Sequence, residues 1–269
     1  MRIVSFAAIK GGVGKTTLTY NFGEWLADRG YKVLMIDNDH QCSLTQQYNI
    51  FTNDNTVADI YKQNGVEPEI KKVNHNLDLI PSSLGLEELN DQLQFKENKA
   101  MLLFMWLADH YSDISAKYDY ILIDCHPDFS TITKNAIAIS DYIISPIEPS
   151  QYGFSSKGNL LARLKVFKEE LIDVRTRKSY INAQPLFIAN RMLHNTKSSR
   201  ELSEVIESDD DITETIPNRE LFNRSTLDNN PLSEMKKDKI KYQKHKAFFD
   251  QIDTIFESLR QKIDGNKGA

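Results

Sequence analysis

The chain has 269 residues with a formal net charge of −5, and 40% of its residues are hydrophobic. This content supports an ordinary buried core, and the net negative charge excludes nucleic-acid binding through overall charge, so such binding requires a local basic patch. Two cysteines, Cys42 and Cys125, lack metal-ligand spacing, which predicts buried thiols in a reducing cytosol. The longest apolar run is far below the ~20 residues of a membrane span, and a strand follows Met1 directly, so we expect no membrane segment, no signal peptide and a cytoplasmic protein.

A buried strand, a glycine-rich turn and a helix open the chain. The apolar run over residues 3–9 predicts the strand, and apolar residues at helical spacing up to Gly30 predict the helix. Glycines let successive N–H groups point at an anion, and the helix N-terminus adds positive potential there. We therefore predict a phosphate-binding loop in which Lys15 reaches the β- and γ-phosphates of ATP and the hydroxyl of Thr16 binds Mg²⁺. The predicted ATP-binding residues of this loop are Lys10, Gly11, Gly12, Val13, Gly14, Lys15, Thr16 and Thr17.

Two later apolar runs end in carboxylates. Residues 32–37 read as a strand ending at Asp37, and the strand within residues 118–127 ends at Asp124. An aspartate at a strand end is also a common helix cap, so each alone says little. Together, behind a phosphate-binding loop, they are predicted to hold the waters of the magnesium ion.

The remaining chain alternates strands with helices, which predicts an α/β fold with a doubly wound, mainly parallel sheet and helices on both faces. We expect one ATP-binding domain over residues 1–263. Its further strands are predicted at residues 77–81, 142–146, 185–190 and 212–217. Helices are predicted from Thr56 to Tyr61, from Leu84 onward, over residues 100–111, up to Asp173 and over about 233–263, and residues 264–269 form a disordered tail.

The phosphate-binding loop departs from the ordinary pattern, because Ile9 stands where the first glycine is expected and Lys10 adds a second lysine. The run Lys-Gly-Gly-Val-Gly-Lys-Thr-Thr resembles the deviant Walker A box of the ParA/MinD family of P-loop NTPases. The run from Asp37 to Gln41 resembles the family's Asp-x-Asp-x-Gln box. This resemblance implies that Lys10 crosses the interface of an ATP-bound homodimer and contacts the partner's nucleotide.

The same resemblance assigns the hydrolytic water to Asp39. A carboxylate is a weak proton acceptor at neutral pH, so we interpret its role as orienting the water, and slow basal turnover follows. The alternative for Asp39 is a helix cap over Cys42 and Ser43.

Residues after two later strands resemble the family's adenine site. The amide of Asn190, next to Arg191, is placed to pair with the base edge, and Pro217 with Asn218 corresponds to the second loop beside the adenine. Asparagine at a strand end is also ordinary turn chemistry. His126 and Asp128 depart from the family's usual Asp-Cys-Pro-Pro-Ser continuation, and their role stays open.

The resemblance implies a ParA-type ATPase for DNA partition. Such a protein forms an ATP-dependent sandwich dimer, binds DNA without sequence preference on the nucleoid, and is stimulated by a ParB-like partner. Because no long extension precedes the first strand, we expect a plasmid as cargo and no operator-binding module. The candidate DNA contacts are Lys236, Lys237 and Lys241, with Arg219 and Arg224 nearby; the alternative is that these lysines form a solvated helix face.

A second reading is a MinD-like ATPase positioned at a membrane or another cellular surface. It requires a terminal amphipathic helix that is free to enter a bilayer. Residues 248–263 are amphipathic, but Asp250, Asp253 and Glu257 on the outer face oppose anionic lipid. We therefore expect this helix to dock on the protein's own core, with no membrane contact. Two scattered cysteines also exclude an iron–sulfur relative.

Overall fold

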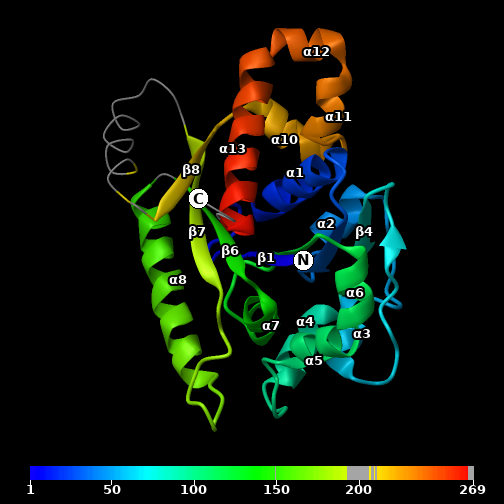
Figure 1. Ribbon diagram of the computed structural model, residues 1–269, viewed down its shortest axis with the longest axis vertical. Coiled ribbons are helices and arrows are strands. Elements are labelled where there is room, and N and C mark those ends of the chain that lie inside the picture. Colours follow the sequence, from blue (N-terminus) through cyan, green and yellow to red (C-terminus); the bar gives the residue numbers. More distant parts are fainter. Residues whose placement is uncertain (149, 193–205, 207–208, 210, 266–269) are drawn as a thin grey trace.

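The computed structural model describes residues 1–148, 150–192, 206, 209 and 211–265. Within these residues one eight-stranded sheet forms the centre of the molecule (Figure 1). All neighbouring strands are parallel except the antiparallel pair β3 and β4, which confirms the predicted mainly parallel sheet. In spatial order the strands are β3 (Lys71–Lys72), β4 (Leu77–Ile80), β2 (Val33–Asn38), β5 (Tyr120–Cys125), β1 (Arg2–Phe6), β6 (Tyr142–Ile147), β7 (Gln184–Met192) and β8 (Ile212–Pro217).

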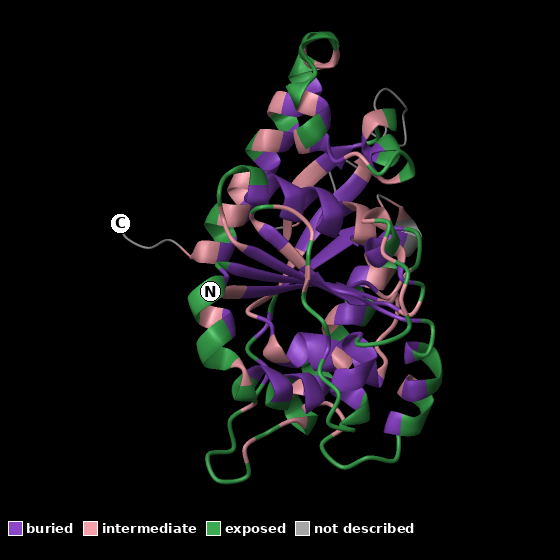
Figure 2. Ribbon diagram, turned by 90° about the vertical axis from the view of Figure 1, so that its right-hand side faces the viewer, coloured by how far each residue is buried: buried purple, intermediate pink, exposed green. Residues whose placement is uncertain are grey.

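Alternating side chains of the strands build two core layers, because successive residues of a strand point to opposite faces of the sheet. On β2, Val33 and Met35 join one layer, whereas Leu34 and Ile36 join the other. Figure 2 shows the buried strands between helices whose outer surfaces are exposed. One face is covered by α1 (Lys15–Asp28), α10 (Glu220–Leu227), α11 (Leu232–Lys237) and α13 (Lys246–Asp264). The other is covered by α3 (Val57–Lys62), α4 (Leu86–Leu93), α5 (Leu102–Asp109), α6 (Tyr111–Lys117), α7 (Thr131–Ile139) and α8 (Gln151–Glu170).

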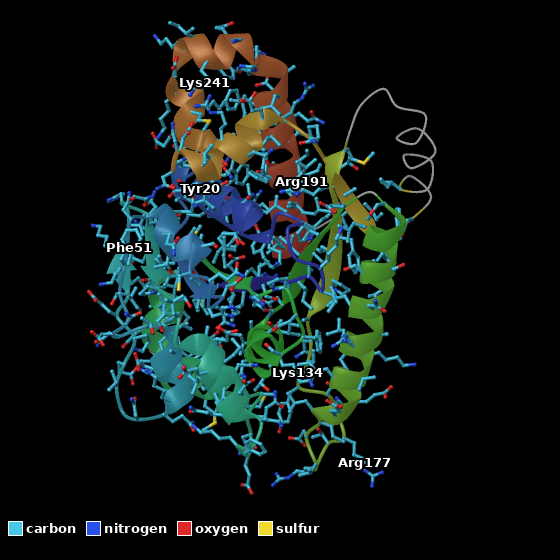
Figure 3. The ribbon with its side chains drawn as sticks, turned by 180° about the vertical axis from the view of Figure 1, so that it is seen from behind. Tyr20, Phe51, Lys134, Arg177, Arg191 and Lys241 are labelled. Carbon is cyan, nitrogen blue, oxygen red and sulfur yellow. The ribbon has the colours of Figure 1, made fainter. Side chains whose placement is uncertain are left out.

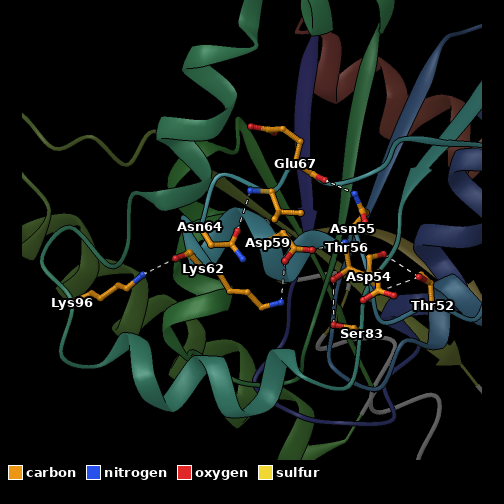
Figure 4. Close-up of polar contacts among 11 residues, drawn as sticks. Thr52, Asp54, Asn55, Thr56, Asp59, Lys62, Asn64, Glu67, Ser83 and Lys96 are labelled. Carbon is orange, nitrogen blue, oxygen red and sulfur yellow. Dashed lines mark hydrogen bonds and ion pairs between the residues drawn. The ribbon is translucent and has the colours of Figure 1, made fainter.

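The predicted cap of α3 is present. The backbone N–H of Thr56 donates to the carboxylate of Asp59 at 2.9 Å, the reciprocal bond completes a capping box, and Lys62 pairs with the same aspartate at 2.9 Å (Figure 4). The hydroxyl of Thr56 also donates to Ser83 at 3.2 Å, which ties α3 to the loop after β4. Local polar residues therefore fix where this helix begins.

The prediction of one terminal helix over about 233–263 is wrong. The segment divides into α11, α12 (Lys239–Lys244) and α13. Asp238 has an extended backbone, and its carboxylate accepts the N–H groups of Ile240 and Lys241, so it starts a new helix instead of continuing the old one. His245, also non-helical, separates α12 from α13. The three helices form an arch at one end of the molecule (Figure 1).

Helix α13 docks on the core, as expected, through its apolar face. Asp253 on its flank accepts the indole N–H of Trp25 at 3.0 Å and forms ion pairs with Arg29 and Lys236. Asp264, placed in the predicted disordered tail, is instead the last residue of α13, and its carboxylate accepts the hydroxyl of Tyr120 at 2.7 Å. Residues 266–269 lie outside the described residues. The buried residues of α13 are Phe248, Phe249, Ile252, Ile255, Phe256, Leu259 and Ile263.

None of the described helices has both the length and the apolar character needed to cross a membrane.

Candidate nucleotide-binding site

The loop between β1 and α1 has the backbone shape that an anion site requires. Gly12 and Gly14 adopt φ values of +76° and +94°, which side chains of L-residues rarely tolerate. Gly14 is the N-cap of α1, and no side chain among the described residues caps this helix end. Its first N–H groups are therefore available to an anion, and the side chain of Lys15, only 6% exposed, begins at the same point.

Asn190 fastens this loop to the end of β7. Its Nδ2 donates to the carbonyl of Val13 at 2.8 Å, and its Oδ1 accepts the N–H of Arg191 at 3.0 Å. A Cβ added at Gly14 would lie 2.5 Å from this Nδ2, so the close approach also requires glycine. The amide predicted to read adenine thus braces the phosphate-binding loop, and its contact with a base stays a prediction.

One small pocket is lined both by residues of the phosphate-binding loop and by the residues predicted to contact adenine. Asn218, beyond the end of β8, is tied to β7 by donating its N–H to the carbonyl of Met192 at 2.8 Å. The pocket is lined by Gly14, Thr17, Asn190, Arg191, Pro217, Asn218, Arg219, Phe222 and Asn223.

Asp37 and Asp124 lie side by side at the ends of β2 and β5, because the strand register pairs them directly. Both are fully buried, and burial raises the pKa of each carboxyl group well above its usual range; for Asp37 the neighbouring Asp124 adds to the rise. One oxygen of Asp37 accepts the N–H and the hydroxyl of Thr45, at 2.8 and 2.6 Å, which holds the first turn of α2 (Ser43–Gln47). Asp37 therefore also has the helix-holding role that is common for an aspartate at a strand end.

Only one of the two carboxylate oxygens of Asp124 has a hydrogen-bond partner among the described residues. Its Oδ1 accepts the hydroxyl of Thr19 at 3.2 Å, whereas its buried Oδ2 has no hydrogen-bond partner among the described residues. The nearby Thr16 hydroxyl and the charge of Lys15 limit the rise of its pKa. An unpartnered buried carboxylate oxygen beside a threonine hydroxyl is the oxygen-rich chemistry that Mg²⁺ prefers, so these residues fit the ion.

Asp39 does not cap α2. Its Oδ1 accepts the N–H of Gln41 and lies 2.9 Å from Nδ1 of His126, while Asp37 holds the start of the helix. The cap over Cys42 and Ser43 that we considered for Asp39 is therefore wrong. His126, whose role the sequence left open, is the side chain that restrains this carboxylate.

Lys10 lies at the rim of the site and pairs within its own chain. Its ammonium group is 2.6 Å from Oε2 of Glu148, and Arg191 approaches the other oxygen at 3.3 Å. The hydrogen bond from Lys10, with the charge of Arg191, holds the pKa of Glu148 below its usual range. No sequence motif singles out Glu148; its position directly after β6, the strand beside β1, is the signal that points to it.

The structure places the candidate DNA contacts in two different surroundings. Lys236 pairs with Asp253, and Lys237 pairs with Asp28 at 3.1 Å and with Glu234 at 2.5 Å. Lys241 instead lines an open groove between α10 and α12 together with Arg219 and Arg224, of which Arg224 pairs with Asp228 at 3.0 Å. Figure 3 shows Lys241 in the arch, on the same end of the molecule as α10.

The fold and the loop together define a P-loop NTPase, and comparisons with known proteins identify the family. A family model described as an AAA domain matches residues 1–177. Sporulation initiation inhibitor protein Soj of Bacillus subtilis is 31% identical over 182 residues, covering 63% of this chain and 67% of Soj. Chromosome partitioning protein ParA of Myxococcus xanthus is 29% identical over 175 residues, covering 63% of this chain and 60% of that protein.

Solved structures agree over nearly the whole length. A Borrelia burgdorferi protein assigned to plasmid partition, solved with AMPPNP bound, has a TM-score of 0.76 and 29% identity, covering 97% of this chain and 99% of that one. The chain belongs to the ParA family of partition ATPases.

Proposed function

We propose that this chain is a Mg²⁺-dependent ATP hydrolase that dimerises around ATP, binds DNA without sequence preference and partitions a plasmid with a ParB-like partner. The observation that carries this proposal is the position of Lys10. Its side chain is 42% exposed at the rim of the phosphate-binding loop, where a second subunit can meet it. Its assigned task, contact with the partner's nucleotide, requires this exposure.

Each residue of the site has a distinct task in hydrolysis. Phosphoryl transfer depends mainly on positioning and on charge stabilisation. Lys15 and the N-terminus of α1 hold the phosphates, and Asn190 keeps the loop in shape through Val13. Thr16 would be a ligand of Mg²⁺, and Asp37 and Asp124 would accept hydrogen bonds from its waters; the bound ion would supply positive charge to the phosphates.

Asp39 orients the attacking water in this scheme. Asp39 is 5% exposed, and contacts with Gln41 and His126 restrain the orientation of its carboxylate. A restrained carboxylate selects one water position but is a weak base, which accounts for slow basal turnover.

DNA binding is assigned to the end of the molecule formed by α10 and α12. Lys239 and Lys244 are exposed and form no ion pair with any described residue, and Lys241 faces the groove that Arg219 lines. Lys236 and Lys237 already have acidic partners, so they offer less free charge to phosphate. Docking of the apolar face of α13 on the core supports this assignment over a membrane-bound MinD-like role.

Binding of labelled duplex DNA tests the proposal. We expect binding with ATP but not with ADP, no preference among sequences, and an affinity that falls steeply with salt. Lys15→Ala removes one charge-assisted phosphate contact, which costs about 1.5–3 kcal/mol, so nucleotide affinity falls roughly ten- to hundredfold and DNA binding disappears. The ATPase rate should rise when DNA and a ParB-like partner protein are added. DNA binding that ignores ATP contradicts the proposal.

A further inference from the structure

Two histidines and a carboxylate gather beside the ends of β2 and β5. The register of these strands pairs Asn38 with Cys125. The next residues along each strand, Asp39 and His126, consequently come together, with Nδ1 of His126 2.9 Å from Oδ1 of Asp39. The imidazole rings of His40 and His126 face each other with centroids 4.2 Å apart. One ligand atom from each of the three side chains lies within 4.8 Å of the other two.

We propose that Asp39, His40 and His126 bind one divalent transition-metal cation of the class of Zn²⁺, Co²⁺ and Ni²⁺. Bonds of about 2.0–2.1 Å in a tetrahedral site put neighbouring ligand atoms roughly 3.3 Å apart. Separations of at most 4.8 Å are therefore closed by small side-chain rotations without moving the strands. Three protein ligands leave a fourth position for water.

The kinds of ligand atom distinguish this site from the proposed magnesium site. Mg²⁺ prefers oxygen ligands, whereas imidazole nitrogen suits zinc and its neighbours in the periodic table. Both histidines are half-buried, so a cation has access from solvent, while Asp39 anchors the inner side. Cys42, two residues beyond His40, donates its S–H to the carbonyl of His40 at 3.3 Å and is not needed as a ligand.

A cation bound at this site should also inhibit ATP hydrolysis, an expectation that rests on the proposed function. A metal bound to Asp39 occupies the carboxylate that orients the attacking water. Hydrolysis of ATP is then inhibited by micromolar transition metal, although Mg²⁺ is present in excess and ATP is still bound.

Titration of the full chain with Co²⁺ tests the site directly, because the visible absorption bands of Co²⁺ report nitrogen and oxygen coordination. The protein is first freed of metal and then kept in excess Mg²⁺. We expect one equivalent bound to the parent protein and a tenfold or greater loss of affinity in His40→Asn and in His126→Asn. The control is His75→Asn, which changes an exposed histidine far from the cluster along the chain and should bind like the parent.

Each outcome decides a separate point. Equal Co²⁺ affinity in the parent and both cluster variants, or no bound equivalent in the parent, overturns the site. His40→Asn keeps the test valid if His126→Asn fails to fold, since circular dichroism identifies a folding failure. One equivalent bound without inhibition of hydrolysis supports the site and contradicts the water-orienting role of Asp39.

Discussion

The ammonium group of Lys10 lies 2.6 Å from the carboxylate of Glu148 in the same chain, although the proposed role of Lys10 is in the partner subunit. The two side chains are 42% and 30% exposed, so the pair is screened by solvent and contributes at most about 1 kcal/mol. Dimerisation must break this contact before Lys10 can reach the second nucleotide. Glu148 therefore competes with the partner's nucleotide for Lys10.

Replacing Glu148 with Gln should strengthen ATP-dependent dimerisation by up to about fivefold, the equivalent of 1 kcal/mol. Lys10→Ala should abolish the dimer while leaving the melting temperature almost unchanged. Analytical ultracentrifugation with ATP and with ADP measures both effects. The control is Glu170→Gln, which removes another exposed lysine pair, with Lys134 at 3.4 Å, on the far side of the molecule from the arch (Figure 3). A weaker dimer in Glu148→Gln would mean that Glu148 supports the interface instead.

Asp39→Ala should separate ATP binding from turnover. Since Asp39 orients only water in the proposed mechanism, ATP binding and dimerisation persist while hydrolysis falls about a hundredfold or more. Size-exclusion chromatography with ATP should then show a dimer that does not decay. Asp109→Ala, which removes an exposed carboxylate of α5, is the control. Normal hydrolysis by a monomeric Asp39→Ala variant would refute the assignment.

The sequence predicts the sheet well because continuous apolar runs mark its buried parallel strands and glycine marks the phosphate-binding turn. The sequence does not predict which residues of distant segments contact each other. Lys10 meets Glu148 across 138 residues and Asn190 meets Val13 across 177, and neither pairing leaves a local pattern. The break between α11 and α12 at Asp238 has a local signal, because aspartate is a preferred N-cap residue. The lysines on both sides of Asp238 favour a continuous helix face, so the sequence alone does not predict the break.

Glu24 gives the protein a pH-dependent stability that is independent of the nucleotide site. Burial raises its pKa from 4.5 to about 7, although Asn74 donates a hydrogen bond to it at 3.1 Å. Because the folded state holds this proton more tightly than the unfolded state, the contribution of Glu24 to stability is greatest below about pH 4.5 and is lost as the pH rises to about 7. One pKa unit corresponds to about 1.4 kcal/mol, so the decrease amounts to as much as about 3 kcal/mol.

Glu24→Gln should remove this decrease, because a neutral amide keeps the shape and the contact with Asn74. Urea unfolding should show the variant more stable than the parent at about pH 8 and nearly equal to it at about pH 4.5. The same substitution at the exposed Glu88 should change neither value. A Glu24→Gln protein that is less stable at the higher pH would show that the charged form is the favoured one.

DNA binding should depend on α12 more than on α11. Lys239, Lys241 and Lys244 have no acidic partner among the described residues, whereas the charges of Lys236 and Lys237 are already matched. Changing the three α12 lysines to Glu should abolish ATP-dependent DNA binding, and replacing Lys236 and Lys237 with Gln should weaken it only slightly. A dimer places two such surfaces on one duplex, so the weakening is amplified through effective concentration.

The control for this experiment must carry the same change in net charge. Arg163, Lys165 and Lys168 lie on α8, which covers the opposite face of the sheet from α13, and their change to Glu alters the charge equally (Figure 1). If α12 binds phosphate, only its triple variant loses binding at physiological salt, and any binding it keeps at low salt has a log–log salt dependence that is lower by about 0.9 for each phosphate no longer neutralised. Size-exclusion chromatography must show that both triple variants still dimerise with ATP. Equally weakened binding in the two variants would indicate that net charge, and not the α12 surface, controls binding. If the α12 variant binds DNA as the parent does, the α12 lysines form a solvated helix face, and the DNA-binding surface has to be sought around Arg219 and Arg224.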